Sequence, residues 1–388
     1  MKLTGFDLRA NEAILIEADG EGVIRHVDPL LDPSEADDLY LAPGFIDLQV
    51  NGFAGVDFNS ADFNSHEASH ESIAKAIRAI ASTGVTRFFP TVITGAPGAM
   101  RAALRNLADA RESLEIGKAM EAFHVEGPHI SPEDGPRGAH PKEWVRAPDF
   151  DEFRGMQDAA RGNIRLVTLA PEWPGAADYI ERLTCEGVVC AIGHTRATAA
   201  QIHDAVSAGA TLSTHLGNGA GSKTRTEEFI TAQLAETRLA ASFIADGHHL
   251  PDDFLRRALE AKGLERSILV TDAVAPAMCA PGPYKLGGVD VELHEDGRVT
   301  LQGGQRLAGS VLRMDRAIEN VMRVAGLTLA QAITLATTNP ARVGKVPARL
   351  KGLQRGARAD VVRFRFTDGH IQIVDAYFSG KLAFAAAS

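Results

Sequence analysis

The segment GVVCAIGHTRATAAQIHDAVSAGATLSTHLGN (187–218) contains the pattern on which the fold prediction rests. Two strand-like runs, 187–195 and 211–218, flank the amphipathic, helix-like stretch 197–209. Apolar strands joined by amphipathic helices are typical of parallel strands that are buried on both faces. The segment therefore predicts a strand–helix–strand unit with parallel strands.

The same pattern recurs along most of the chain. Further strand candidates are GFIDLQV (44–50), TRFFPTVIT (86–94), EAFHVEG (121–127), IRLVTLAPE (164–172), LAASFIADG (239–247) and SILVTDA (267–273). Helix-like stretches at 70–84 and 96–114 lie between the first of these. Eight such units favour a closed (β/α)₈ barrel of the TIM type over an open, doubly wound sheet.

The two ends of the chain read differently from the middle. Residues 1–40 contain EAILIEADGEGVIRHV, and residues 348–388 contain ARADVVRFRF and GHIQIVDAYFSGK, all strand-like. We expect these ends to form a small β-sandwich domain beside a barrel that spans 41–347. The helix-like stretches 314–326 and 328–339 would complete the barrel.

Composition excludes several classes of protein. The formal net charge of -10 makes a nucleic-acid partner improbable, because such binding depends on Lys and Arg neutralising phosphates. Apolar runs are all shorter than the ~20 residues of a membrane span, and acidic residues interrupt the N-terminus where a signal peptide would be apolar. We therefore expect a cytoplasmic protein without a membrane partner.

Polar residues mark the carboxyl ends of the predicted strands. In a (β/α)₈ barrel these ends share one face, where the loops build the active site. Helix packing alone would not place acids and histidines there. The residues concerned are Asp47, Gln49, Asn51, Glu126, His194, His215, Asp246 and Asp272.

Glu126, His194 and His215 form a candidate metal site. One carboxylate and two imidazoles are suited to a catalytic divalent metal that keeps an open position for water. A single histidine is more often structural, but three candidate ligands on neighbouring strand ends favour a metal. Zinc is the expected ion, with iron, cobalt and manganese as alternatives that accept the same ligands.

Asp272 ends an apolar strand in LVTDA. It would serve as a helix N-cap in an isolated setting, whereas beside a metal it would serve as a general base. We favour catalysis. His140 in RGAHP, and His248 or His249 in ADGHHL, lie on loops of the same face and are candidates for substrate contact.

Two further loops have a structural and a functional interpretation. Asn218 and Gly219 follow His215 and would line the same pocket, although both residues are also common in simple turns. The segment LQGGQRLAGS (301–310) matches no phosphate-binding fingerprint, and we interpret it as a turn whose LAGS portion shapes the pocket.

Taken together, these segments resemble the N-acetylglucosamine-6-phosphate deacetylase family of the amidohydrolase superfamily. The resemblance covers nearly the whole chain in the family's order. It is carried by APGFIDLQVNG (42–52), HVEGPHI (124–130), RGAHP (137–141), GHT (193–195), STHLGN (213–218), ADGHHL (245–250), LVTDAVAPA (269–277), LAGS (307–310), TTNPA (337–341) and GLQRGARADVVRF (352–364).

The resemblance implies a hydrolase that releases acetate from an amino-sugar 6-phosphate and acts as a homodimer. It matches Glu126, His194 and His215 to the metal ligands and Asp272 to the catalytic acid/base. His140, Asn218, Gly219 and His249 match positions that contact the sugar phosphate. His140 is also a candidate to support the oxyanion during catalysis.

Two departures from the family pattern are visible. Many amidohydrolases hold a second metal with an H-x-H motif, where this chain has Gln49 and Asn51. Neutral amides are weak ligands, so one metal per subunit is expected, with both side chains available to substrate or water. The family's R-E-P-G segment, whose Arg reaches the phosphate in the partner subunit, is replaced by GSKTRTEEF, which places Arg225 near the expected position and Lys223 beside it.

These departures leave two alternatives to the deacetylase. One is an amidohydrolase for a different N-acyl substrate, such as a non-phosphorylated amino sugar or an N-acyl amino acid. The other is a catalytically silent barrel with a binding role, which the presence of Glu126, His194, His215 and Asp272 disfavours.

Overall fold

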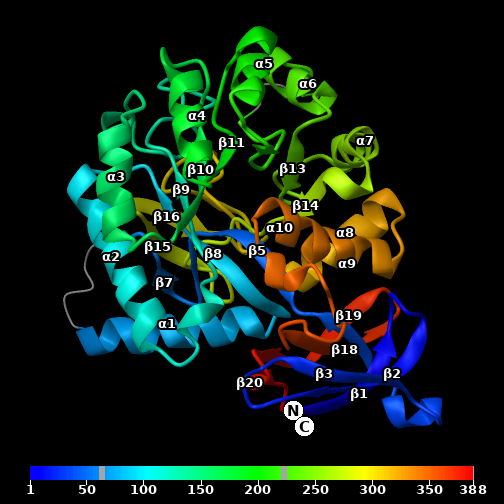
Figure 1. Ribbon diagram of the computed structural model, residues 1–388. Coiled ribbons are helices and arrows are strands. Elements are labelled where there is room, and N and C mark those ends of the chain that lie inside the picture. The colour runs from blue at the N-terminus through cyan, green and yellow to red at the C-terminus, as the bar shows by residue number, and fades with distance from the viewer. Residues whose placement is uncertain (61–65, 220–224, 388) are drawn as a thin grey trace.

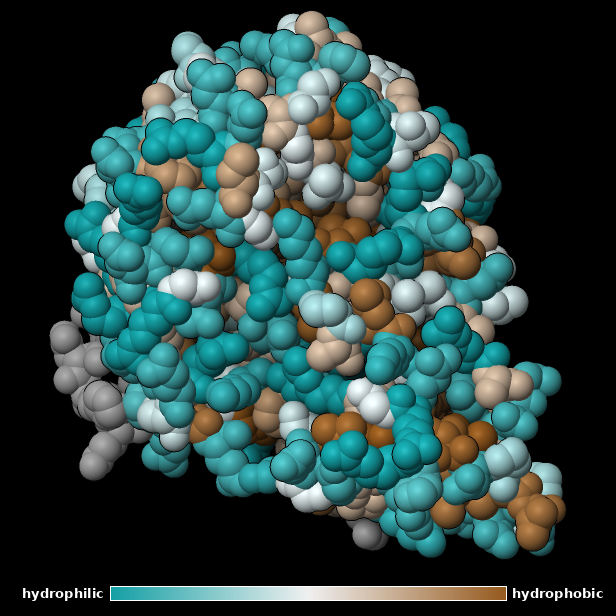
Figure 2. Space-filling view, in the orientation of Figure 1, coloured by the Kyte–Doolittle hydropathy of each residue, from teal (hydrophilic) through white to brown (hydrophobic). Residues whose placement is uncertain are grey.

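The computed structural model describes residues 1–60, 66–219 and 225–387. Figure 1 shows a barrel surrounded by helices, with a second sheet beside it that contains both ends of the chain. On the face drawn in Figure 2, hydrophilic residues cover most of the surface and apolar residues form small, separate groups. No helix in the described ranges is long and apolar enough to cross a membrane.

The central sheet has eight strands in the order β14-β13-β12-β11-β10-β9-β8-β5. Every neighbouring pair is parallel. This confirms the predicted barrel and its eight strand candidates. The strands are β5 (Phe45–Val50), β8 (Val85–Ile93), β9 (Phe123–Glu126), β10 (Ile164–Leu169), β11 (Val189–Ile192), β12 (Leu212–Ser213), β13 (Ala240–Phe243) and β14 (Ser267–Leu269).

The barrel closes between its first and last strands just beyond the end of β14. The backbone N–H of Asp272 donates to the carbonyl of Gln49 at 3.0 Å, and that of Asn51 donates to the carbonyl of Ala273 at 2.7 Å. A parallel bridge joins Val50 to Ala273. The closure therefore brings Gln49 and Asn51 next to Asp272.

The helices pack their apolar faces against the barrel, as parallel strands buried on both faces require. Two of them begin with a capping box, in which Thr198 and Thr328 exchange hydrogen bonds with a glutamine three residues later. The α-helices are α1 (His66–Ala81), α2 (Pro97–Ser113), α3 (Phe150–Ala159), α4 (Ala176–Cys185), α5 (Ala199–Ser207), α6 (Glu228–Ala235), α7 (Asp252–Lys262), α8 (Met314–Ala325), α9 (Leu329–Ala336) and α10 (Thr338–Val343). Short 3₁₀ helices are η1 (Pro33–Ala36), η2 (Gly117–Ala119), η3 (Lys142–Trp144), η4 (Leu264–Arg266) and η5 (Pro347–Arg349).

Strands from the two chain ends form one seven-stranded sheet in the order β20-β19-β18-β4-β1-β2-β3. Its centre joins the ends, because β4 pairs in parallel with β1 and antiparallel with β18. The predicted division at residues 40 and 348 stays a prediction. The strands are β1 (Lys2–Asp7), β2 (Glu12–Ala18), β3 (Ile24–Pro29), β4 (Tyr40–Pro43), β18 (Val361–Thr367), β19 (His370–Phe378) and β20 (Lys381–Ala385).

Two small sheets lie near the carboxyl ends of the barrel strands. The first is a hairpin of β6 (Gly52–Phe53) and β7 (Val56–Asp57). The second is a three-stranded antiparallel sheet, absent from the sequence-based prediction, that packs on Ile93 and Val274. Its strands are β15 (Gly282–Leu286), β16 (Val289–Leu293) and β17 (Val299–Leu301).

A buried ionic cluster joins the barrel to the terminal sheet. Arg87 on β8 and Arg349 in η5 both donate to Asp360 Oδ2 at 2.7 Å, and all three side chains are at most 4% exposed. Arg349 also donates to the carbonyl of Gly44, just before β5, at 2.6 Å. Burial raises the pKa of Asp360, but the charges of Arg87 and Arg349 outweigh burial and hold that pKa below its ordinary value. The cluster therefore depends on an ionised Asp360.

Replacing Asp360 with Asn should lower the free energy of unfolding by about 3–5 kcal/mol, because buried Arg349 would lose its carboxylate partner and Arg87 would keep only Glu121. Denaturant unfolding followed by circular dichroism measures the change. Asp19→Asn, which alters an exposed ion pair with Arg25, is the control and should change stability by less than about 1 kcal/mol.

The pH dependence checks the cause. A carboxyl group whose pKa is lowered by folding contributes stability above its unfolded pKa of about 4 and loses that contribution as the pH falls. The stability difference between the wild type and Asp360→Asn should therefore shrink below pH ~4. A difference that stays constant down to pH ~2 would argue against an ionic role.

Candidate functional site

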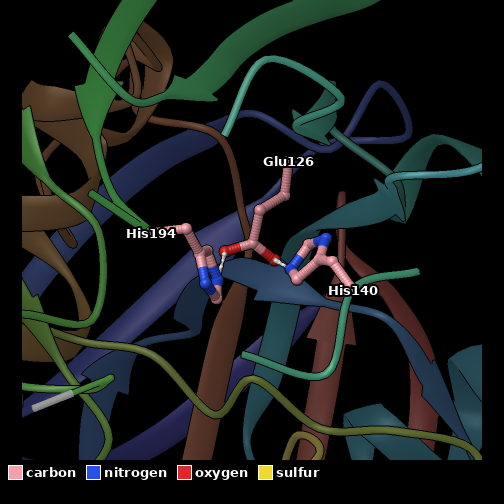
Figure 3. A group of neighbouring side chains, drawn as sticks. All are labelled: Glu126, His140 and His194. Atoms are coloured by element: carbon pink, nitrogen blue, oxygen red, sulfur yellow. Dashed lines mark hydrogen bonds and ion pairs between the residues drawn. The ribbon is translucent and has the colours of Figure 1, made fainter. Parts of the chain in front are cut away.

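The carboxylate of Glu126 lies at the centre of the polar strand ends. Glu126 is the last residue of β9 and is 2% exposed. Its Oε1 lies 2.8 Å from His215 Nε2 and 3.2 Å from His194 Nε2, and its Oε2 lies 4.0 Å from His140 Nε2. Figure 3 shows His194 and His140 on opposite sides of this carboxylate. The structure thus brings three histidines together around Glu126: the two predicted metal ligands, His194 and His215, and also His140.

Second contacts orient two of the imidazoles. The Nδ1 atom of His194 lies 2.9 Å from the carbonyl oxygen of Pro136, and that of His140 lies 2.9 Å from Thr94 Oγ1. Metal-binding histidines commonly use one ring nitrogen in this way, which leaves the other nitrogen aimed at the ion. In both residues the inward nitrogen is Nε2.

Backbone strain coincides with the candidate residues. The φ angles are +49° at His194, +31° at His215 and +52° at Asp272. Left-handed backbone costs a residue other than glycine about 1–2 kcal/mol, and such strain gathers at functional sites. The end of each strand is thus bent to aim its polar side chain into the barrel mouth.

The pKa values of the buried groups in the cluster are shifted in different directions. Burial, followed by the charge of His194, lowers the pKa of His140 to about 3. Burial alone would raise the pKa of Glu126, but hydrogen bonds and charges from His194 and His215 lower it well below its ordinary value. Burial alone would lower the pKa of His215, but the hydrogen bond and charge of Glu126 outweigh burial and raise it. A buried carboxylate beside imidazole nitrogens is a donor set for a divalent metal. Ligand atoms of Glu126, His140 and His194 lie within 4.8 Å of one another.

Asp272 lies beside this cluster and is held by two amides. Gln49 Nε2 donates to Asp272 Oδ1 at 3.0 Å, and Asn51 Nδ2 donates to the same oxygen at 2.6 Å. Burial, then the charge of Glu126, raises the pKa of Asp272 to about 6. The two residues in the H-x-H positions therefore orient the aspartate, and in the part of the chain that the structure describes no donor contacts its Oδ2.

A layer of supporting hydrogen bonds holds these residues; the sequence-based prediction included Asp47 as a polar strand-end residue but not its supporting role, and it missed His124. Asp47 Oδ2 accepts from Thr271 Oγ1 at 2.6 Å, which fixes the turn that carries Asp272. His124 Nε2 lies 2.8 Å from Thr168 Oγ1, which in turn lies 2.7 Å from Thr214 Oγ1, next to His215. The available signal was position, because Asp47 and His124 each stand two residues before a candidate, on the same face of a strand.

The candidate metal ligands and Asp272 line a cavity of about 320 Å³. The predicted residues Asn51, Glu126, His140, His194, His215, Asn218, Gly219, Arg225, His249 and Asp272 all line it, and so does His248. Gln49 is 2% exposed and is absent from the described lining. The volume fits a small metabolite.

The two neighbouring histidines of ADGHHL differ in their surroundings. His249 is 9% exposed, and its Nδ1 lies 2.7 Å from Asp246 Oδ2, so its Nε2 is the atom left for a ligand. His248 is exposed at the cavity rim. The contact with Asp246 favours His249 as the better oriented of the two.

Arg225 binds backbone at the cavity wall. Its Nε donates to the carbonyl of Gly217 at 2.9 Å and its Nη2 to the carbonyl of His249 at 2.7 Å. Its guanidinium carbon lies 5.7 Å from the centre of the Phe254 ring. Arg225 thus ties two active-site loops together. Lys223 lies outside the described residues.

The three-stranded sheet and the LAGS segment that follows it form one wall of the cavity; the sequence-based prediction had LAGS shaping the pocket but did not include the sheet. Leu286 and residues 306–309 line the cavity from this side. The signal was present in YKLGGVDVELHEDGRVTL (284–301), where alternating apolar residues flank Gly-rich turns.

Comparison with known proteins agrees with this architecture. Residues 40–383 match the model of the amidohydrolase family. The chain is 33% identical over 368 residues to an N-acetylgalactosamine-6-phosphate deacetylase of Escherichia coli O157:H7, covering 94% of this chain and 93% of that protein. It is 35% identical over 353 residues to an N-acetylglucosamine-6-phosphate deacetylase of Bos taurus, covering 88% and 83% respectively.

A solved structure shows the same likeness. A variant of the N-acetyl-D-glucosamine-6-phosphate deacetylase of Mycobacterium smegmatis, in complex with N-acetyl-D-glucosamine-6-phosphate, superposes with a TM-score of 0.86 at 30% identity and covers 99% of both chains. The family match and these relatives show that the chain belongs to the amidohydrolase family and, within it, to the N-acetylglucosamine-6-phosphate deacetylase family.

Proposed function

We propose that this protein is a metal-dependent deacetylase that hydrolyses N-acetylglucosamine 6-phosphate to glucosamine 6-phosphate and acetate. The main support for this proposal is that Glu126, three imidazoles and the oriented carboxylate of Asp272 line one cavity. The relatives named above act on hexosamine phosphates, and one is named for the galactosamine epimer. The 4-epimer is therefore a second candidate substrate.

Glu126, His194 and His215 would hold one divalent ion per subunit, with Zn²⁺ the proposed identity. The Nε2 atoms of His194 and His215 both lie next to Glu126 Oε1. The contact between His194 Nδ1 and the carbonyl of Pro136 orients the ring in a way that favours metal binding through Nε2. Gln49 and Asn51 already donate to Asp272, which supports a single ion. When bound, a divalent metal lowers the pKa of water and polarises an amide carbonyl.

Asp272 would move the proton. Its Oδ1 is held by two amides, so Oδ2 can take a proton from the attacking water and deliver it to the departing amine. A neutral His140, with Nδ1 accepting from Thr94, would donate from Nε2 to the developing oxyanion. Asn218, Gly219 and His249 would contact the sugar.

Location and assembly belong to the same proposal. We place the enzyme in the cytoplasm as a homodimer, which is supported by its resemblance to the family. Light scattering on the purified protein tests the dimer, and a monomer at micromolar concentration would contradict it.

The function predicts acetate release from N-acetylglucosamine 6-phosphate by the zinc-loaded enzyme. The reaction should run faster on this substrate than on the unphosphorylated sugar, since phosphate supplies binding energy. An acetate assay on both sugars, and on the 4-epimer phosphate, measures the preference. Activity confined to N-acyl amino acids would refute the proposal.

Replacing Asp272 with Asn should lower kcat by about 10²–10⁴-fold, because the proton carrier is lost while the shape is kept. Metal content, measured by mass spectrometry, should stay near one ion per chain. The matched control is Asp315→Asn in α8, which changes a buried aspartate outside the cavity lining and should leave kcat unchanged. Near-normal turnover of Asp272→Asn would remove it from the mechanism.

Metal removal should abolish activity and lower the unfolding temperature, since an ion that binds only the folded state stabilises it. Chelation, calorimetry and readdition of zinc, cobalt, manganese or iron test this and rank the metals. Glu126→Gln should bind metal weakly and stay inactive after readdition. Full turnover by metal-free wild type would contradict the proposal.

A further inference from the structure

The lining of the cavity is electrically asymmetric. Glu126 and Asp272 are buried in the lining, whereas two arginines of the lining are more accessible: Arg225 is half-buried and Arg306 is exposed. The chain as a whole carries a net charge of -10, so a pair of arginines in one lining is a local exception. The buried and the accessible parts of the lining are therefore suited to different parts of a ligand.

Arg306 has a charge that the carboxylate of Asp134 partly offsets without forming an ion pair. Its side chain is exposed, and its Nη1 donates to the carbonyl of Gly138 at 3.0 Å. Within 1–60, 66–219 and 225–387, no carboxylate forms an ion pair with Arg306, and its Nε and Nη2 donate to no protein acceptor. Two N–H groups on one edge of the guanidinium are thus left for a ligand.

The contact with Gly138 places Arg306 close to the candidate metal centre. Gly138 belongs to the loop that carries His140, and a methyl group added at Gly138 would lie 3.1 Å from His194 Cε1. Gly138 therefore contacts Arg306 through its carbonyl and approaches the ring of His194 through its Cα.

The backbone of Arg306 is fixed to the three-stranded sheet. Its carbonyl accepts from the N–H of Leu301 at 2.9 Å, and Ala308 N–H donates to the carbonyl of Val299 at 3.0 Å. Thr300 and Leu307 form an antiparallel bridge. A side chain on such a pinned segment is partly pre-organised for binding.

Arg225 differs in all these respects. Its guanidinium is half-buried, donates to two backbone carbonyls and lies over Phe254. Burial lowers its pKa. Its visible contacts join loops, whereas Arg306 offers donors to the cavity.

We propose that Arg306 is the residue that binds the 6-phosphate of the substrate, supplied by the same subunit that holds the metal site. The inference rests on the proposed function and adds a specificity residue to it. Arginine suits this task because its planar fork of N–H donors matches two phosphate oxygens at once. The phosphate at exposed Arg306 and the acetamide at the buried carboxylates would fix the direction of the sugar.

The experiment compares Arg306→Ala and Arg306→Lys with the wild type. Binding of glucose 6-phosphate, which has the phosphate but no amide, is measured by calorimetry on the zinc-loaded protein, with glucose as the reference. Arg306→Ala should weaken glucose 6-phosphate binding ~10–100-fold, the range for a lost charged hydrogen bond. Arg306→Lys should fall between, since it keeps a point charge without the fork.

Deacetylation kinetics supply a second readout. In Arg306→Ala the KM for N-acetylglucosamine 6-phosphate should rise by a similar factor, while kcat changes by less than about threefold. Arg298→Ala is the matched control, because Arg298 is an arginine of the same small sheet that pairs with Asp296 and is absent from the lining. It should behave as the wild type.

Failure of this inference is distinguishable from failure of the proposed function. Wild type that deacetylates the phosphorylated sugar, with Arg306→Ala unchanged in KM and in glucose 6-phosphate binding, would overturn the role of Arg306 alone. Wild type without deacetylase activity would overturn the function, and the glucose 6-phosphate titration would still decide whether Arg306 binds phosphate.

Discussion

The burial of the Glu126 carboxylate is the constraint on which the barrel mouth depends. An isolated buried charge is costly, so the surrounding structure must supply compensating partners. Three imidazoles do so, and two of them are held from behind by Thr94 and the carbonyl of Pro136. The strained backbone at His194 and His215 follows from the same requirement, because an ordinary strand conformation would direct these rings elsewhere.

Sequence alone was sufficient for the barrel and for the residues at its mouth. Strands buried on both faces are apolar nearly throughout, so β8 and β11 were recognisable as short apolar runs. A polar residue at the end of such a run has few structural uses, which made Glu126, His194 and Asp272 conspicuous. The amphipathic helices between them gave the parallel order, and the deacetylase resemblance gave the same residues by an independent route.

What sequence could not supply was the direction of side chains and their partners. Gln49 and Asn51 were expected to be available to substrate or water, whereas both amides donate to Asp272 from the other side of the barrel closure. That contact joins residues more than two hundred positions apart, so no local pattern reports it. The three-stranded sheet was not predicted, since its strands are short and the segment 301–310 that follows them was interpreted only as a turn; Arg306 in that segment was not singled out.

The pairing of β4 with β18 has a consequence for how the chain is made. Pro43 pairs with Val361, so the first strands to be synthesised meet their central partner only when the last part of the chain is complete. Without β18, one edge of β4 is unpaired. The hydrogen bonds by which Arg349 joins Asp360 to the carbonyl of Gly44 also require this last part of the sheet. The seven-stranded sheet therefore cannot be completed without the segment that contains β18, β19 and β20.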